Sequence, residues 1–335
     1  MPARMFAAEA SRSTMVRADA RKIHVALQGR KVLMYEKHGQ RRAMTRTRAV
    51  DAVVNVGVEA IESTSSVRRV YIEHTDAYQV MFYANYFRFA ADACEEALAE
   101  SGVGGGGVDA RMVAVRNCKY ARAARLGDDV RVRTRWVRSD EASGRATFEQ
   151  TVEDARGEAY LSAEVTYALL SDARGGVTTT VDDPHGVDVE TSETMVRLFR
   201  DEQSRGADGS SHVDVLRYFE RGRTDAIGGS DALSELKEKH GVVVVVSRLE
   251  AEFPERILPR ESLDAASGIP TCGVKSTVEF KRRNIQVVFH QALYAPDGVT
   301  CVGRADITCT CLDAATMRPI SCPDALVQKF VAFTV

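Results

Sequence analysis

Residues 74–87 read HTDAYQVMFYANYF, and this stretch decides the fold. The alternating run Val67–Glu73 precedes it and predicts a strand, whereas apolar residues at helical spacing from Phe82 to Leu98 predict a helix. Asp76 therefore lies just ahead of a helix start, where free backbone N–H groups favour negative charge. Attack on a carbonyl needs a group that attacks or activates water, and a donor that holds the oxyanion. Asp76 is thus a candidate catalytic residue; the alternative is a residue that only caps the helix or closes a turn.

Alternating runs separated by turn signals follow the predicted helix, which ends near Ser101. The runs, each expected to be a strand, are Met112–Tyr120, Val130–Arg138, Ala146–Glu153 and Ala159–Leu170. Glycine-containing turns are expected between them at Gly127, Gly144 and Gly157. One helix followed by an antiparallel sheet is an α+β unit, and the open face of such a sheet needs a partner.

The second half of the chain repeats this order. When the sequence is aligned with itself at one constant offset, Asp76 aligns with Asp208 and Tyr86-Phe87 aligns with Tyr218-Phe219. At a second, larger offset, Phe148-Glu149-Gln150 aligns with Phe289-His290-Gln291. The larger second offset requires an insertion, expected around Phe253–Ile269. We therefore predict a tandem duplication, with domains at 65–172 and 191–330, a linker at 173–190 and a basic N-terminal extension at 1–60.

The residues from Asp76 to Tyr86 resemble the signature of hotdog-fold thioesterases of the 4-hydroxybenzoyl-CoA thioesterase type. That signature is Asp-x-x-Gly, a hydrophobic stretch, and a Tyr on the first turns of a central helix. The Leu126-Gly127-Asp128 turn and Phe148-x-Gln150 also fit, and the resemblance extends from 65 to 170, and more loosely from 192 to 325. It implies an α+β fold of two tandem hotdog domains, each a long central helix wrapped by an antiparallel β-sheet.

The resemblance also implies the chemistry. Asp76 matches the carboxylate that acts as nucleophile or as general base toward water, and Tyr83 matches the position whose backbone N–H polarises the thioester carbonyl. Gln79 stands where the family has Gly. The residues expected to line the substrate pocket are Gln79, Val80, Phe82 and Tyr86. The implied function is hydrolysis of an acyl-CoA or acyl-carrier-protein thioester to a free carboxylic acid, without a cofactor or a metal.

A second site is expected at Asp208 and His212, where the sequence resembles the Asp-x-x-Gly-His-Val variant of the family with Ser211 in the Gly place. His212 has the alternative of an ordinary exposed loop histidine. A polar loop, Arg200–Ala207, precedes Asp208, so we expect the first copy to be the working one. Carboxylates on the first helix are another option, although a solvated helix face explains them better; they are Asp92, Glu95 and Glu96.

Basic residues of the second half are candidates for holding the phosphates of CoA by charge-assisted hydrogen bonds. They are Arg217, Arg221, Arg223, Lys281, Arg282 and Arg283. The alternative is a set of plain solvated turns. An acidic acyl carrier protein would use a similar positive rim.

Two other functions remain open from sequence. The duplicated fold could bind an acyl group or a partner protein without catalysis, the changes at Gln79 and Ser211 then marking a decayed site. A hydratase or dehydratase fits less well, because no Asp-x-Asn-x-x-His run is found. The serine-hydrolase, zinc-protease and P-loop motifs are missing as well.

Composition indicates the cellular compartment and excludes some classes of binding partner. The seven cysteines form no C-x-x-C pair, so they favour reduced core residues in a reducing intracellular compartment over a metal site at Cys309-x-Cys311. Residues 1–50 hold twelve Lys and Arg against three acids, which resembles a plastid or mitochondrial transit peptide; a disordered extension of a cytoplasmic protein is the alternative. Beyond residue 60 the charge balance does not suit nucleic-acid binding, and no apolar run spans a bilayer. A homodimer of double hotdogs is also expected.

Overall fold

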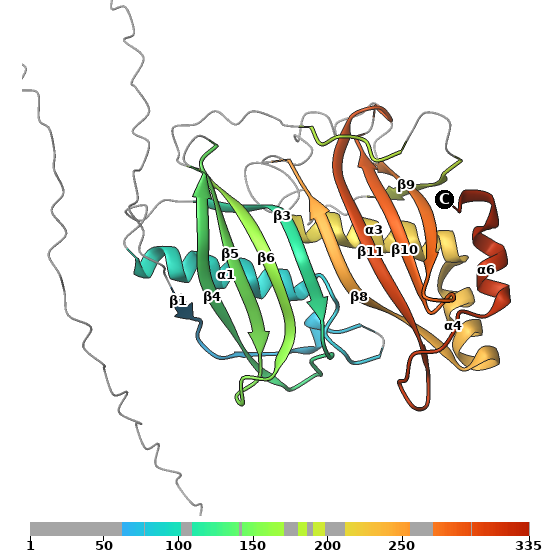
Figure 1. Cartoon of the computed structure of the whole chain (residues 1–335), viewed down its shortest axis with the longest axis horizontal. Helices are drawn as coiled ribbons and strands as arrows, with labels where there is room; N and C mark the ends of the chain where they lie inside the picture. The colour runs from blue at the N-terminus through green and yellow to red at the C-terminus, as the bar shows by residue number, and fades with distance from the viewer. Residues whose placement is uncertain are drawn as a thin grey trace, which may run out of the picture. The chain divides into compact units, whose positions relative to one another are not determined.

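The strands of the computed structural model form one antiparallel sheet, with helices against it (Figure 1). The structure describes residues 62–76, 78–101, 109–140, 143–170, 180–185, 190–197, 212–254, 271–295 and 297–334. Within these ranges the strand order is β1-β4-β5-β6-β3-β8-β11-β10-β9-β7, with β2 paired to β4 off this path. The predicted α+β class is therefore confirmed.

Residues 62–170, here called the first half, contribute β1 and β2, then α1 and four long strands. Their bounds are β1 Glu62–Thr64, β2 Arg68–Arg69, α1 Asn85–Glu100, β3 Asp109–Tyr120, β4 Asp129–Asp140, β5 Arg145–Glu153 and β6 Ala159–Leu170. The alternation of β4, in which every second side chain is buried through Trp136, gives the sheet one apolar face for α1 to cover. The four long strands confirm the predicted runs.

Residues 190–334, here called the second half, repeat the order of a short strand, a helix and four long strands, and add two further helices. Their bounds are β7 Ser192–Arg197, α3 His212–Ile227, α4 Gly229–His240, β8 Val242–Glu252, β9 Thr271–Lys281, β10 Gln286–Tyr294, β11 Cys301–Asp313, α6 Asp324–Phe330 and a closing 3-10 turn Val331–Phe333. The helix α3 lies against β7, β9 and β10, and α6 closes the end of the chain beside α3.

The sheet order of the second half is the reverse of the first, because β3 and β8 pair at the centre and β1 and β7 lie at the two edges. Cys118 of β3 lies opposite Leu249 of β8 in this central pairing. The end of β8 follows the end of β3 by the same number of residues that separates Asp208 from Asp76. The start of β9 follows the start of β4 by a larger number of residues. The extra residues of the second half therefore fall between β8 and β9, where the sequence indicates an insertion.

A buried glutamine anchors the helix to the sheet in each half. Gln150 of β5 donates to the Ala90 carbonyl of α1 at 2.7 Å, and the Tyr167 hydroxyl donates to its Oε1 at 2.9 Å. Gln291 of β10 donates to the Phe219 carbonyl of α3 at 3.2 Å. A buried amide requires such partners, which explains why Phe-x-Gln occurs at equivalent places in the two halves.

One prediction about the elements is wrong. In Val67–Glu73 only Arg68–Arg69 pairs as a strand, since Ile72–His74 turns into a 3-10 helix. The second half does contain a long helix, since α3 has 16 residues, as many as α1. Gly228 and Gly229, with φ of 112° and 82°, follow α3 and separate it from α4, because such φ angles are easily adopted only by glycine.

Gly222 sets how closely α3 approaches the sheet. A Cβ at this position would lie 2.6 Å from Cγ1 and 3.0 Å from Cβ of Val274 on β9. Valine is stiff at χ1, so it gives way poorly. We expect Gly222→Ala to lower the free energy of unfolding by about 1–2 kcal/mol, since overpacking outweighs the gain in helix propensity.

Chemical denaturation of both single variants and of Gly222→Ala with Val274→Ala tests this contact. The valine truncation removes the clashing methyl groups, so the double variant should lose less stability than the two single losses combined. If the stability loss of the double variant equals the sum of the two single losses, α3 does not pack against Val274 at this point.

Candidate functional site

Asp76 lies in a tight hairpin that leads directly into α1. Thr75 pairs with Met81, the Phe82 N–H donates to the His74 carbonyl at 2.9 Å, and the Asp76 N–H donates to the Val80 carbonyl at 2.9 Å. The hairpin therefore places Asp76 opposite Val80, in the turn whose second strand leads into α1. Its two strands are short because α1 begins at Asn85.

The turn of this hairpin explains the unusual glutamine of the signature. The Gln79 N–H donates to the Asp76 carbonyl at 3.0 Å, and the Tyr78 N–H donates to Asp76 Oδ1 at 2.8 Å, as in an Asx turn. Gln79 has φ of 60°, the left-handed region in which glycine is favoured. Gln79 thus keeps the backbone conformation that Gly would adopt, with its side chain exposed.

The Asp76 carboxyl is half-buried, and burial raises its pKa above the usual range. Hydrogen bonds from the Tyr78 and Val80 N–H groups lower the pKa, while the negative charge of Glu220 on α3 raises it; the net shift is upward. A carboxylate with a raised pKa is a stronger base near neutral pH. Perturbed carboxyls of this kind cluster at functional sites.

Tyr83 lies two residues before α1, with its side chain directed into the protein. Its hydroxyl donates to the Leu216 carbonyl of α3 at 2.5 Å, and its own carbonyl accepts from the Tyr120 hydroxyl at 3.1 Å. Among the residues described, no acceptor is bonded to the Tyr83 N–H. A donor of this kind beside a helix start is the element that an oxyanion requires.

The remaining pocket candidates differ in burial. Val80 and Phe82 are half-buried at the hairpin. Tyr86 is 1% exposed, and its hydroxyl accepts from the Ala124 N–H at 2.8 Å. Tyr86 therefore belongs to the core of the first half, behind the hairpin.

The helix α3 reaches this hairpin from the second half. Besides the bond from Tyr83 to Leu216, the Arg217 guanidinium donates to Asn85 Oδ1 at 3.3 Å. The Arg223 guanidinium lies 5.2 Å from the centroid of the Tyr83 ring. The first-half site thus has walls from both halves. The sequence signature did not indicate these contacts between α3 and the hairpin segment.

The predicted phosphate ligands are dispersed. Arg223 is 3% exposed and bonded to Glu220 and to Gln291 Oε1, so its role as a surface phosphate ligand is wrong. Arg221 donates to the Arg197 carbonyl at 3.1 Å. Lys281, Arg282 and Arg283 are exposed at the β9–β10 turn, where Ser321 bonds the Arg283 carbonyl. Phosphate binding by these exposed residues stays a prediction.

The predicted second site is described only at His212, since Asp208 lies outside the described residues. His212 is the first residue of α3 and is 9% exposed. A ring nitrogen of His212 lies 3.2 Å from the Pro254 carbonyl, and the ring meets Phe253 edge-on. The interpretation as an exposed loop histidine is therefore wrong, because the helix begins at this residue and packs it against the end of β8.

The other titratable candidates have structural roles. Asp92 and Glu96 on α1 both pair with Arg68 at 2.6 Å, which supports the solvated-face interpretation. The seven cysteines, all within the described ranges, are buried and without a disulfide. Across those ranges no group of three or more His, Cys, Asp or Glu is arranged to hold a metal.

A search of the same residues for a membrane-spanning helix finds none of sufficient length and apolar character.

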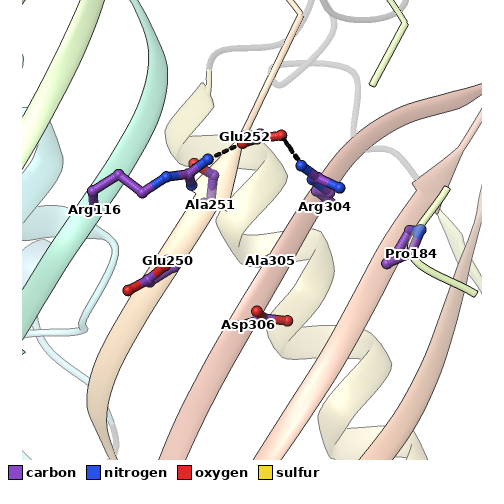
Figure 2. A pocket seen from close by; sticks show the side chains of 8 residues that line it. All are labelled: Arg116, Pro184, Glu250, Ala251, Glu252, Arg304, Ala305 and Asp306. Carbon is purple, nitrogen blue, oxygen red and sulfur yellow. Dashed lines mark hydrogen bonds and ion pairs between the residues drawn. The ribbon is translucent and has the colours of Figure 1, made fainter. Parts of the chain in front are cut away.

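A hollow of about 280 Å³ lies where β3, β8 and β11 meet, away from the predicted residues (Figure 2). Glu252 of β8 binds both Arg116 of β3 and Arg304 of β11, the latter with Nε 2.7 Å from Oε2. These side chains are partly exposed, and such pairs contribute about 0–1 kcal/mol each. The Arg116–Glu252 pair therefore links β3 to β8, and the Arg304–Glu252 pair links β8 to β11.

Tyr83→Phe separates the backbone of this residue from its hydroxyl. The change removes the bond to Leu216 and should lower the free energy of unfolding by about 1 kcal/mol. Because the N–H remains, kcat/KM on an acyl thioester should stay close to the wild-type value, as in the exposed control Tyr71→Phe. A loss as large as that of an Asp76 variant would instead assign chemistry to the hydroxyl.

Comparisons with known proteins agree with this fold. Residues 78–159 match the family model of the thioesterase superfamily. A protein assigned as an oleoyl thioesterase from Lactobacillus plantarum aligns with a TM-score of 0.54 at 10% identity, covering 76% of this chain and 96% of that one. An acyl-ACP thioesterase from Bacteroides thetaiotaomicron VPI-5482 aligns with a TM-score of 0.50 at 8% identity, covering 74% and 97%. Among curated proteins none matches the sequence.

At these identities the two structures show the fold alone, while the family match covers the Asp76 hairpin from Tyr78 onward, together with α1 and β3 to β5. The chain therefore has the hotdog fold of thioesterases, and its residues 78–159 match the family model of the thioesterase superfamily.

Proposed function

We propose that the protein is a hydrolase of acyl thioesters, with acyl-CoA or an acyl carrier protein as the substrate, and that Asp76 carries the reaction. The observation that supports this most is the hairpin that leads into α1, because its turn holds a half-buried carboxyl with a raised pKa. The thioester carbonyl would accept from the Tyr83 N–H. Hotdog structures of two acyl thioesterases support the substrate class.

Two routes fit this arrangement. As a general base, Asp76 takes a proton from water, the water oxygen attacks the carbonyl carbon, and the C–S bond breaks to release a thiolate. As a nucleophile, a carboxylate oxygen attacks instead, the thiolate leaves, and water then hydrolyses the resulting anhydride. In both routes the Tyr83 N–H would stabilise the negative charge on the carbonyl oxygen.

We also propose that the chain is two tandem hotdog domains, at 65–172 and 191–330, joined by 173–190. The repeated order of strands about the β3–β8 pairing supports this. So does the coverage of about three quarters of this chain by nearly whole thioesterase chains. The extension 1–60 lies outside the described residues.

The test is hydrolysis of a panel of acyl-CoAs and acyl carrier proteins by the full chain, with release of the free thiol as the readout. Sustained release from at least one class of acyl chain supports the proposal and identifies the substrate. A protein that retains a labelled acyl chain without releasing thiol would instead be the non-catalytic binding module.

A further inference from the structure

The side chain of Asn85, the first residue of α1, bonds the strand that carries Asp76. Its Nδ2 donates to the His74 carbonyl at 2.9 Å, and the residue is 1% exposed. The same carbonyl accepts from the Phe82 N–H at 2.9 Å, so it joins the two strands of the hairpin. A buried amide keeps such a bond, because losing it would leave a polar group unpaired. Asn85 therefore fixes this strand at His74, two residues before Asp76.

The backbone of Asn85 fixes the direction of the Tyr83 N–H. The Asn85 N–H donates to the Phe82 carbonyl at 2.9 Å. That carbonyl and the Tyr83 N–H belong to one peptide group, which is planar and trans, so they point in opposite directions. A bond that fixes the carbonyl therefore also fixes the N–H. Asn85 thus contacts both parts of the proposed site, the strand of Asp76 through its side chain and the peptide of Tyr83 through its backbone.

Arg217 of α3 determines the orientation of the Asn85 amide. Its guanidinium donates to Asn85 Oδ1 at 3.3 Å. A guanidinium has donors and no acceptor, so the amide atom that faces it is the oxygen, and the Nδ2 group is then directed at the His74 carbonyl. Arg217 in turn pairs at 3.4 Å with the buried Asp214, which lies one turn earlier on the same helix. The second half of the chain therefore orients an amide of the first half.

The two residues of this contact hold equivalent places in the two halves. The offset that aligns Asp76 with Asp208 also aligns Asn85 with Arg217, and the helices that carry them contact each other. An amide both accepts and donates, whereas the guanidinium of Arg217 only donates. The contact can therefore serve the first-half site and not an equivalent site at Asp208.

We infer that Arg217 is a positioning residue for the proposed thioester hydrolysis and that it acts through Asn85 on the Tyr83 N–H. Through the His74 carbonyl the same amide holds the strand of Asp76. This inference rests on the proposed function, in which the Tyr83 N–H stabilises the oxyanion. The direction of that N–H matters most in the transition state, because the negative charge on the carbonyl oxygen develops there. Loss of the guanidinium should therefore lower kcat and leave KM close to the wild-type value.

Steady-state thiol release by the full chain tests the kinetic part, with the acyl thioester of the panel that the wild type hydrolyses fastest. Arg217→Met should lower kcat by about 10–100-fold, the usual scale for misplaced reacting groups. Arg217→Lys retains a donor and should recover part of the loss. The matched control, Arg135→Met, removes an exposed arginine of β4 that pairs with Glu149, and it should keep the wild-type kcat. A raised KM with unchanged kcat would mean that Arg217 binds the substrate instead, and it would overturn the inference.

A measurement without substrate tests the positioning itself. The full chain is labelled with ¹⁵N at tyrosine, and Tyr83→Phe assigns the backbone amide signal of Tyr83. We expect this signal to shift in Arg217→Met and in Asn85→Ala, and to keep its place in Arg135→Met. A Tyr83 signal that stays in place in folded Arg217→Met overturns the inference. A wild type that releases no thiol from any thioester counts against the proposed function alone, since the NMR signal does not depend on turnover.

Discussion

Asp76→Asn should lower kcat/KM on an acyl thioester by about 10²–10⁴-fold, the usual cost of removing a positioned general base. Asparagine has the same shape, and its amide oxygen can still accept from the Tyr78 N–H, which donates to Asp76 Oδ1 at 2.8 Å. The turn therefore survives while the group that accepts a proton or attacks the carbonyl is lost. Steady-state thiol release and a thermal melt measure the two effects separately.

Asp92→Asn is the matched control for this variant. It makes the same chemical change on α1, where the carboxylate is exposed and paired with Arg68. It should retain activity, since a solvated ion pair contributes little. The reverse pattern, with Asp92→Asn inactive and Asp76→Asn active, would move the chemistry to the helix carboxylates.

Arg223→Met should lower the free energy of unfolding by about 3 kcal/mol. Breaking a buried ion pair costs about 3–5 kcal/mol, and the partial exposure of Glu220 places the effect at the lower end. The variant also leaves Gln291 Oε1 without its donor at 2.8 Å. Methionine fills much of the volume, so the loss reports on charge and hydrogen bonding more than on a cavity.

Urea denaturation of Arg223→Met and of Arg221→Met checks this prediction. Arg221 is the neighbouring arginine on α3, where it bonds the Arg197 carbonyl, and its loss should cost about 1 kcal/mol. Adding Glu220→Gln to Arg223→Met should recover part of the stability, because it removes the uncompensated carboxylate. Equal losses in the two arginine variants would mean that the buried pair does not stabilise α3.

Much of the fold could be predicted because the first half has regular periodicity. The alternation of β4 and the helical spacing from Phe82 to Leu98 reflect a sheet and a helix that bury one face each. The prediction of a strand at Val67–Glu73 was wrong because its alternating apolar residues are not all buried against the helix. Val67 is 51% exposed, and Ile72–His74 forms a 3-10 helix. The break at Gly228 and Gly229 could be inferred only by weighing glycine against the continuing helical pattern.

Only part of the candidate site could be predicted, because only part of it is local in sequence. Asp76 and Gln79 belong to one local turn, so a short sequence motif contains them, including the position that needs a positive φ. Glu220 and Arg223 come from the other half, and their approach to Tyr83 depends on how α3 packs. Arg223 resembled a phosphate ligand in sequence because nothing local indicates that Gln291 and Glu220 enclose it.

A single-turnover experiment tests the central claim, that Asp76 performs thioester hydrolysis, most directly. An excess of enzyme is mixed with one labelled acyl thioester. The amounts of bound thioester and of free acid are then followed over time for the wild type and for Asp76→Asn. We expect the wild type to convert the bound thioester fully to acid, and Asp76→Asn to bind it and leave it intact. Conversion by Asp76→Asn at the wild-type rate would contradict the account.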